Sequence, residues 1–157
     1  MDKDEFAQQV RAAEGTLYNV AKTMLLNESD CEDAVSDAIL SAWLRLDSLR
    51  ETRYFKTWLV RILINECNKR LRRKRFTVPY EDYMDTPAPE REDYSDLYRA
   101  VAELKPKFRI AVLLFYIEGY SLGETARLLN IPQGTVKSRL NAARKILKER
   151  LRDEDLP

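Results

Sequence analysis

Apolar residues recur at steps of three and four along most of this 157-residue chain, and no segment shows convincing alternation between apolar and polar positions. That spacing gathers apolar side chains on one face of a helix, whereas alternation would mark a strand. The pattern covers residues 5–26, then residues 31–46, and then a stretch from about 55 to 74. Ser29 and Asp30, between the first two stretches, are candidate N-caps for the second helix. The first half of the chain is therefore predicted to be a group of helices.

The helical pattern stops after residue 75, where three prolines stand among acidic residues with little periodicity. Such a composition is typical of a linker. The pattern resumes over residues 94–104, and Pro106 and Gly119 are placed to begin and end the next helix. We therefore expect an all-α fold of two small helical domains, residues 1–75 and 94–152, joined by an acidic, Pro-containing linker over residues 76–93.

The segment that begins at residue 121 reads SLGETARLLNIPQGTVKSRLNAARKIL and predicts two helices joined by a tight turn. Ser121 and Glu124 have the spacing of a capping box, which starts a helix. Asn130 can end that helix in the left-handed conformation, and Pro132 can begin the next one, where its missing N–H costs nothing. This layout predicts a helix-turn-helix, whose second helix enters the major groove of DNA.

Apolar residues in this segment are spaced to bury the two helices against each other. The set comprises Leu122, Ala126 at the crossing point, Leu128 or Leu129, Ile131, Val136, Leu140 and Ala143. Polar and basic residues fall on the opposite face of the second helix, and this face is the candidate DNA-binding surface: Thr135, Lys137, Ser138, Arg139, Asn141, Arg144 and Lys145.

Within that surface, Lys137, Ser138 and Asn141 lie three and four residues apart and are candidates for base contacts. Arg139, Arg144 and Lys145 suit phosphates, which position a protein on DNA without specifying sequence. An ordinary helical hairpin with a solvated basic face would show the same charges, but it would need the capping box, the turn and the basic helix to coincide by chance.

Charge is distributed unevenly, although the net charge is only +1. Ten Lys and Arg residues fall within residues 50–75 against two acidic ones, and seven fall within residues 135–152 against one. Acidic stretches precede both basic blocks. Two separate surfaces that face a polyanion would produce this distribution, and so would a pair of domains that mask each other.

The first basic block mixes aromatic and cationic residues, as single-stranded nucleic acid binding requires, because bases stack and phosphates pair with cations. Phe55 and Trp58 could instead belong to the core, with the cations forming a solvated face. The candidate contacts for single-stranded DNA are Lys56, Trp58, Arg61, Asn65, Lys69 and Arg72.

Several classes of function are disfavoured. The chain has no histidine, and its two cysteines, Cys31 and Cys67, form no CxxC pair, so we expect neither a zinc site nor histidine-based catalysis. We expect no cofactor and no small-molecule substrate. The charged N-terminus and the absence of a long apolar stretch predict a cytoplasmic protein without a signal peptide or membrane span.

Three segments in order resemble the extracytoplasmic-function (ECF) sigma factors, the smallest class of the sigma-70 family, and the resemblance covers nearly the whole chain. The segment DAVSDAILSAW from Asp33 is similar to the family's polymerase-binding helix. The segment FKTWLVRILIN from Phe55 is similar to its −10 segment, and GTVKSRL from Gly134 is similar to its −35 recognition helix.

The resemblance implies that the protein is not an enzyme but directs RNA polymerase to promoters. It implies docking of the first domain on the clamp helices of the largest polymerase subunit through Asp33, Ser36, Asp37 and Leu40. A base of the −10 element would flip into a pocket near Asn65, and the second domain would read the −35 element. An anti-sigma factor is the regulatory partner that the family implies. The alternatives are a free-standing helix-turn-helix regulator and a helical adaptor for an acidic partner.

Overall fold

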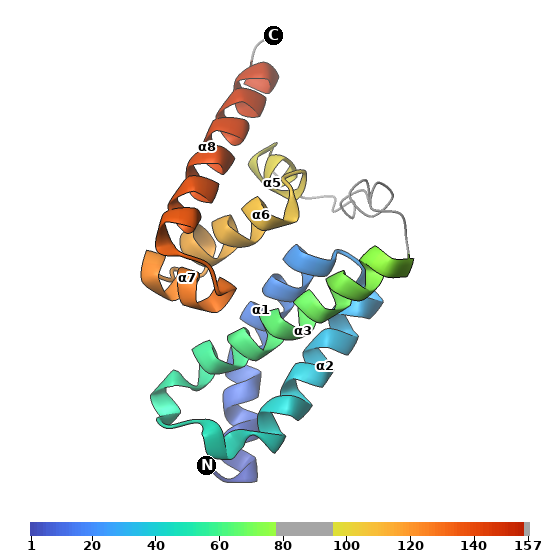
Figure 1. Ribbon diagram of the computed structural model, residues 1–157, viewed down its shortest axis with the longest axis vertical. Helices are drawn as coiled ribbons and strands as arrows, with labels where there is room; N and C mark the ends of the chain where they lie inside the picture. The colour runs from blue at the N-terminus through green and yellow to red at the C-terminus, as the bar shows by residue number, and fades with distance from the viewer. Residues whose placement is uncertain (78–95, 156–157) are drawn as a thin grey trace. The chain divides into compact units, whose positions relative to one another are not determined.

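The computed structural model describes residues 1–77 and 96–155, and within those ranges the chain forms helices and no strands. It divides into two compact units, Met1–Pro79 and Tyr80–Pro157 (Figure 1). The expected all-α fold in two helical domains is therefore confirmed. Most of the expected linker lies outside the described residues, and its first two positions, 76 and 77, belong to the preceding helix.

The first unit contains three long helices, α1 (Lys3–Leu25), α2 (Glu28–Leu44) and α3 (Phe55–Thr77), and each packs against the other two (Figure 1). Short 3-10 turns, Leu46–Ser48 and Thr52–Tyr54, connect α2 to α3. The core takes residues from all three helices, and those with essentially no exposure include Leu17, Val20, Cys31, Ala34, Leu59, Leu63 and Cys67.

The start of α2 differs from the sequence prediction. Its N-cap is Asn27, whose side chain accepts a hydrogen bond from the backbone N–H of Asp30 at 3.0 Å. Ser29 and Asp30, predicted as caps, lie within the first turn of the helix. Asn, Ser and Asp are all good caps, so local chemistry does not decide among neighbouring candidates. With Asn27 as the cap, the backbone N–H of Cys31 donates to the Asn27 carbonyl at 3.0 Å.

Aromatic rings join the three helices near the start of α3. Phe6 makes edge contacts with Trp43 and Phe55, with ring centroids 5.0 and 5.5 Å apart, and Phe55 lies 6.0 Å from Trp58. Phe55 is fully buried, whereas Trp58 is half-buried. The core interpretation of Phe55 is thus correct, while Trp58 keeps part of its ring accessible.

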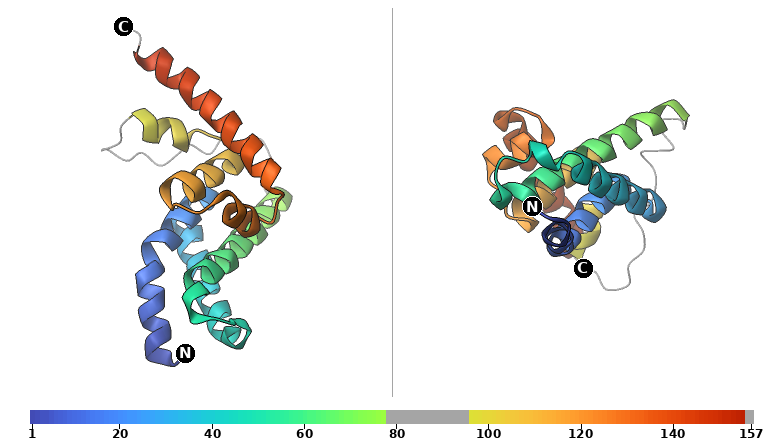
Figure 2. Two further views of the ribbon diagram at one scale, coloured as in Figure 1. Left: turned by 90° about the vertical axis from the view of Figure 1, so that its left-hand side faces the viewer. Right: turned by 90° about the horizontal axis from the view of Figure 1, so that it is seen from below.

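The second unit contains α5 (Asp96–Ala102), α6 (Pro106–Val112), α7 (Leu122–Leu129) and α8 (Gln133–Asp155). Figure 2 shows α8 as one uninterrupted helix. It packs against α5, α6 and α7 and supplies much of the core. The buried residues of this core include Leu104, Ala111, Val112, Ala126, Val136, Leu140 and Ala143.

A π-helical turn, η3 (Leu113–Ile117), follows α6 directly. Its wide geometry is visible in the hydrogen bond from the Glu118 N–H to the Leu113 carbonyl at 2.8 Å. Gly119 follows two positions after the turn, and its φ of +78° confirms the predicted left-handed helix end. Single π turns of this kind occur often at functional sites because they redirect the side chains that follow.

Candidate nucleic-acid interface

The helix-turn-helix has the local geometry that its sequence predicts. Ser121 and Glu124 form the capping box, with N–H···O distances of 3.1 and 3.2 Å between each backbone and the other's side chain. Asn130 ends α7 in the left-handed conformation, with φ 56° and ψ 48°. Pro132 lies one position before α8, where its carbonyl accepts from Thr135 and Val136. Each end of the turn is therefore set by local chemistry.

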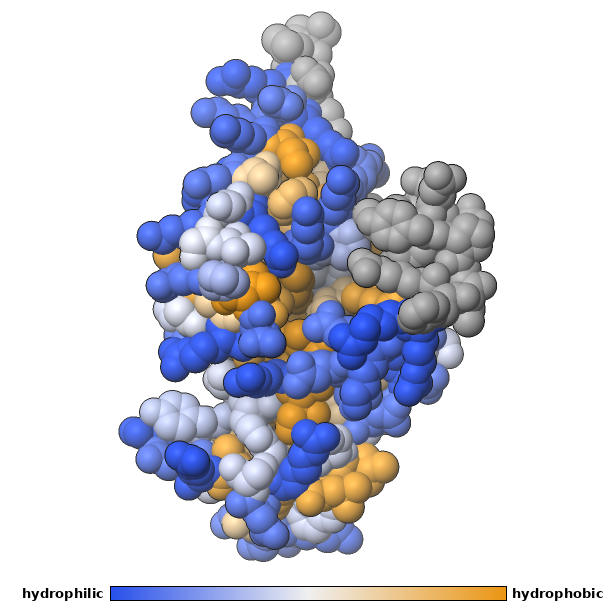
Figure 3. Space-filling model, in the orientation of Figure 1, coloured by the Kyte–Doolittle hydropathy of each residue, from blue (hydrophilic) through white to orange (hydrophobic). Residues whose placement is uncertain are grey.

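The predicted DNA-binding surface of α8 is largely accessible. Lys137, Ser138, Asn141, Arg144 and Lys145 are exposed, while Thr135 and Arg139 are half-buried. Hydrophilic side chains predominate over α8 on the face shown in Figure 3. Opposite them, Val136, Leu140 and Ala143 are buried, as the spacing predicts.

Three of the predicted DNA-contacting residues of α8 already have hydrogen-bond partners. The Ser138 hydroxyl donates to the Gly134 carbonyl one turn earlier, at 3.1 Å. Arg144 donates from Nη2 to Asn141 Oδ1 and from Nη1 to the hydroxyl of Tyr116, at 2.5 Å in the second case. Asn141 and Arg144 thus act as a linked pair, and Tyr116 is a residue that sequence reasoning missed.

Two more polar residues on the helix-turn-helix were also missed, Arg127 on α7 and Gln133 at the start of α8. A methyl group on Gly123 would lie 3.6 Å from Gln133 Nε2 and 4.0 Å from Arg127 Nη2. The two donors therefore both lie near the N-terminal end of α7. A methyl group at Gly123 would make only ordinary van der Waals contacts with them, so the glycine is no sequence signal for this arrangement.

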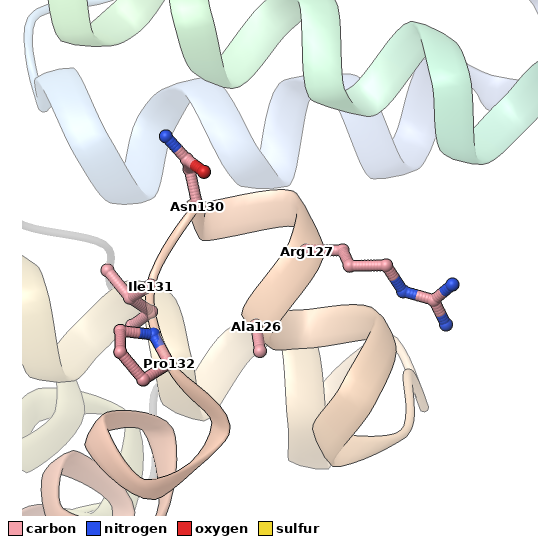
Figure 4. A pocket seen from close by; sticks show the side chains of 5 residues that line it. All are labelled: Ala126, Arg127, Asn130, Ile131 and Pro132. Carbon is pink, nitrogen blue, oxygen red and sulfur yellow. The ribbon is translucent and has the colours of Figure 1, made fainter.

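A shallow hollow lies beside the turn, lined by Ala126, Arg127, Asn130, Ile131 and Pro132 (Figure 4). Figure 4 shows the Arg127 guanidinium directed away from the turn. The hollow contains no group that titrates near neutral pH, so it offers shape and an adjacent cation but no acid–base chemistry.

A second basic surface lies on α3. Lys56, Arg61, Asn65, Lys69 and Arg72 are exposed along this helix, and Trp58 is half-buried beside them. Lys69 pairs with Glu66 at 3.2 Å, three residues earlier on the same helix. Trp58, Arg61, Asn65, Lys69 and Arg72 therefore share one face of α3, on which Trp58 is half-buried, whereas Lys56 is exposed at the start of the helix on its other side.

The exposed face of α2 carries the remaining predicted site. Asp33, Ser36, Asp37 and Leu40 recur at helical spacing and are exposed, with 58% of the Leu40 surface accessible. Two apolar residues extend this face beyond the prediction, Trp43 at 42% and Leu44 at 74% exposure. Asp37 also forms an ion pair with Arg70 of α3, with 2.5 Å between Oδ2 and Nη2.

Within the described ranges, no group of three or more Cys, Asp or Glu side chains is placed to hold a metal ion. Burial, reinforced by the neighbouring Cys31, raises the pKa of the Cys67 thiol to about 12. Such a thiol stays protonated and is a poor nucleophile and metal ligand. No helix in the described residues is long and apolar enough to cross a membrane.

The first unit is helical, with a basic face on α3 and an exposed face on α2. The second unit is built on a basic helix-turn-helix. Together these features define the class of DNA-binding transcription factors. Two family models match the two units separately. The model for sigma-70 region 2 matches residues 10–77, and the model for sigma-70 region 4 matches residues 94–147.

The chain belongs to the ECF sigma factors of the sigma-70 family and is an RNA polymerase sigma factor. It is 32% identical to the ECF RNA polymerase sigma factor SigW of Bacillus subtilis, over 97% of this chain and 91% of that protein. It is 36% identical to the ECF RNA polymerase sigma factor SigM of Mycobacterium tuberculosis, over 91% of this chain and 75% of that one.

Two solved structures share the fold. The sigma factor RpoE from Bartonella quintana, in complex with the anti-sigma factor NepR, superposes with a TM-score of 0.78 and 28% identity, covering 94% of this chain and 97% of that chain. CnrH, in complex with the cytosolic domain of CnrY, gives a TM-score of 0.66 and 25% identity, covering 98% and 91% respectively.

Proposed function

We propose that the exposed face of α8 reads the −35 element and that the exposed face of α3 reads and melts the −10 element. The observation that carries the proposal is the helix-turn-helix, whose α8 buries Val136, Leu140 and Ala143 while exposing a row of cations and amides. A duplex accepts such a helix in its major groove. The functional boundaries that we propose are residues 1–75 for the −10 unit, 76–93 for the linker and 94–152 for the −35 unit.

On α8, the proposed base contacts are Lys137, Ser138 and Asn141, and the proposed phosphate contacts are Arg139, Arg144 and Lys145, with Thr135 at the start of the surface. Ser138 donates its hydroxyl proton to its own helix, so it would act as an acceptor toward DNA. Arg127 and Gln133 add donors at the end of α7, where helix-turn-helix proteins cross the DNA backbone.

On α3, the proposed contacts to the −10 element are Lys56, Trp58, Arg61, Asn65, Lys69 and Arg72. The half-buried Trp58 offers a ring on which an unpaired base could stack, and the surrounding cations follow the backbone. Flipping a base from the duplex costs a few kcal/mol, and hydrogen bonds near Asn65 would offset that cost.

On α2, we propose that Asp33, Ser36, Asp37 and Leu40 bind the clamp helices of the largest subunit of core polymerase. The two additional exposed residues, Trp43 and Leu44, enlarge the apolar part of this face. An exposed apolar stripe beside carboxylates is the composition of a docking surface with an apolar centre and a charged rim.

An anti-sigma factor is a further proposed partner, since both solved neighbours are complexes and that of RpoE contains an anti-sigma factor. Such a protein would cover the polymerase-binding and DNA-binding faces. We also propose that the protein has no catalytic activity of its own, because phosphodiester chemistry belongs to the polymerase, and that it works in the cytoplasm with that enzyme.

The test is in vitro transcription with bacterial core polymerase on genomic fragments, with every start site mapped. Discrete starts that require this protein would support the proposal, and their shared upstream sequences would define the two elements. The absence of such starts, together with sequence-specific binding of the protein alone to DNA, would favour the free-standing helix-turn-helix regulator instead.

A matched pair of variants localises the −35 contact. Lys137→Ala should weaken binding to the mapped promoters by about 1–3 kcal/mol and reduce initiation from them accordingly. Lys148→Ala removes the same charge from an exposed position further along α8 and should have a much smaller effect. Equal losses for the two variants would show that α8 contributes only general positive charge.

A further inference from the structure

Tyr116 reaches the DNA-binding surface of α8 from a different element of the second unit. It lies in the π-helical turn, 28 positions before Arg144, and its hydroxyl oxygen accepts from Arg144 Nη1 at 2.5 Å. The other Nη of the same guanidinium donates to Asn141 Oδ1. The three exposed side chains form one hydrogen-bonded chain, Tyr116 to Arg144 to Asn141.

The Tyr116 ring has a packing partner on the second unit. It meets Phe115 edge-on, with centroids 4.9 Å apart and planes at 83°, and Phe115 packs against the core of the helix-turn-helix. The π turn adds one residue to the helical repeat, which rotates the following side chains by about 100° relative to a regular α-helix. Tyr116 therefore contacts the core through Phe115, while 49% of its own surface is exposed.

This hydrogen-bonded chain of side chains determines which way the carboxamide of Asn141 faces. A carboxamide has an acceptor end and a donor end, and a guanidinium has donors only. The Asn141 side-chain oxygen must therefore face the Arg144 guanidinium, and the amino group of Asn141 faces away from it. An exposed Asn without such a partner would rotate and offer either end to a base.

We propose that Tyr116 is a positioning residue for promoter recognition: through Arg144 it fixes the Asn141 carboxamide so that its amino group faces the major groove. Asn141 then favours a base with an acceptor in the groove and discriminates against cytosine, whose groove edge carries only an amino donor. This proposal rests on the proposed reading of the −35 element by α8.

The test is a competition experiment with the reconstituted holoenzyme and promoters in which each −35 position carries all four base pairs. Asn141→Ala identifies the position that this residue reads. Tyr116→Phe removes the hydroxyl but keeps the ring on Phe115, and Arg144→Met removes the middle member of the hydrogen-bonded chain. Both should lose about tenfold in discrimination against cytosine, at that same position.

The matched control is Tyr18→Phe, which removes a hydroxyl from an exposed tyrosine of α1 and should leave base selectivity unchanged. Far-UV circular dichroism of each variant verifies that it is folded. Base selectivity separates positioning from a merely structural role, because a loosened fold would weaken binding to every promoter alike.

The outcomes are distinguishable. If Asn141→Ala alters one position while Tyr116→Phe and Arg144→Met keep the wild-type selectivity there, the positioning proposal is wrong and the reading by α8 stands. If Asn141→Ala alters no position, the positioning proposal fails because Asn141 reads no base. If the wild-type holoenzyme shows no promoter selectivity at all, the proposed function itself fails.

Discussion

Arg70 of α3 pairs with Asp37 of α2, with 2.5 Å between Nη2 and Oδ2, and thereby ties the proposed polymerase-binding helix to the proposed DNA-melting helix. The guanidinium is mostly buried, with 19% of its side chain exposed, and its Nε has no hydrogen-bond partner in the described structure. Asp37 therefore has a structural partner as well as a proposed contact with polymerase.

Replacing Asp37 with Asn should destabilise the first unit by about 1 kcal/mol, because Arg70 loses its counter-charge. This free energy is the upper end of the range for an ion pair with one exposed partner. Both tryptophans, Trp43 and Trp58, belong to the first unit, so tryptophan fluorescence in urea measures this change. Asp33→Asn on the same face is the control, and we expect it to weaken polymerase binding without shifting the urea midpoint. Equal midpoints for both variants would mean that the ion pair contributes nothing.

Gly15 lies in the middle of α1 at an exposed position, and a methyl group added there would meet nothing within 4 Å. Gly15→Ala should therefore stabilise the first unit by about 0.5–1 kcal/mol, since alanine loses less backbone entropy on folding. A higher urea midpoint by fluorescence, with an unchanged slope, is the expected result. A lower midpoint would show that the surface of α1 at Gly15 is less open than the structure indicates.

Gly119 should respond in the opposite direction to the same substitution. Its φ of +78° is a conformation that a Cβ disfavours, so Gly119→Ala should cost about 1–2 kcal/mol. The second unit contains no tryptophan, so far-UV circular dichroism follows its unfolding while fluorescence should stay unchanged. If the circular dichroism transition does not move, the turn before the helix-turn-helix tolerates another conformation.

Thr125 is fully buried in α7, and its hydroxyl has no hydrogen-bond partner within the described structure. Because a buried unsatisfied hydroxyl costs free energy, Thr125→Val should stabilise the second unit by about 1 kcal/mol. Thr125→Ser keeps the hydroxyl and loses a methyl group, so it should destabilise the unit. Thermal unfolding followed by circular dichroism compares the two, and stabilisation by Ser would contradict this account.

Cys67 predicts a loss of stability at alkaline pH. Its pKa is raised by burial and by Cys31 to about 12, from an ordinary value of 9.0. Above pH 9 the thiol ionises in the unfolded chain but stays protonated in the folded one, so the unfolded state binds fewer protons. Stability attributable to this group is present below pH 9 and is lost as pH rises toward 12.

Two measurements address this prediction. The urea midpoint from fluorescence should fall between pH 9 and pH 11, and Cys67→Ala should reduce that fall, although it also lowers stability at neutral pH by leaving a cavity. At pH 8, labelling of the native protein by iodoacetamide should be slow and should accelerate in urea. Rapid labelling without urea would contradict the burial of Cys67.

The sequence predicted the parts of the fold that depend on neighbouring residues. The capping box of Ser121 and Glu124 and the left-handed residues Asn130 and Gly119 were predicted because each signal lies within a few positions of its effect. The start of α2 was predicted wrongly because Asn27, Ser29 and Asp30 are all competent caps and the local sequence does not decide among them.

Contacts between distant positions were beyond sequence reasoning. The bond between Tyr116 and Arg144 spans 28 positions and depends on the π turn, for which the apolar run around Leu113 gives no signal. The pair of Asp37 and Arg70 spans 33 positions. Periodicity identified the exposed faces of α2, α3 and α8, but it could not tell which of their side chains are already engaged with one another.

Each unit closes its own hydrophobic core, the first from α1, α2 and α3 and the second from α5 to α8. Leu17 and Leu63 lie in the first core, and Val136 and Leu140 lie in the second. In evolutionary terms the two halves are separately heritable modules. The unit that carries the proposed −35-reading face can drift toward a new promoter, or be exchanged by recombination, while the half that carries the proposed polymerase-docking face retains its fold.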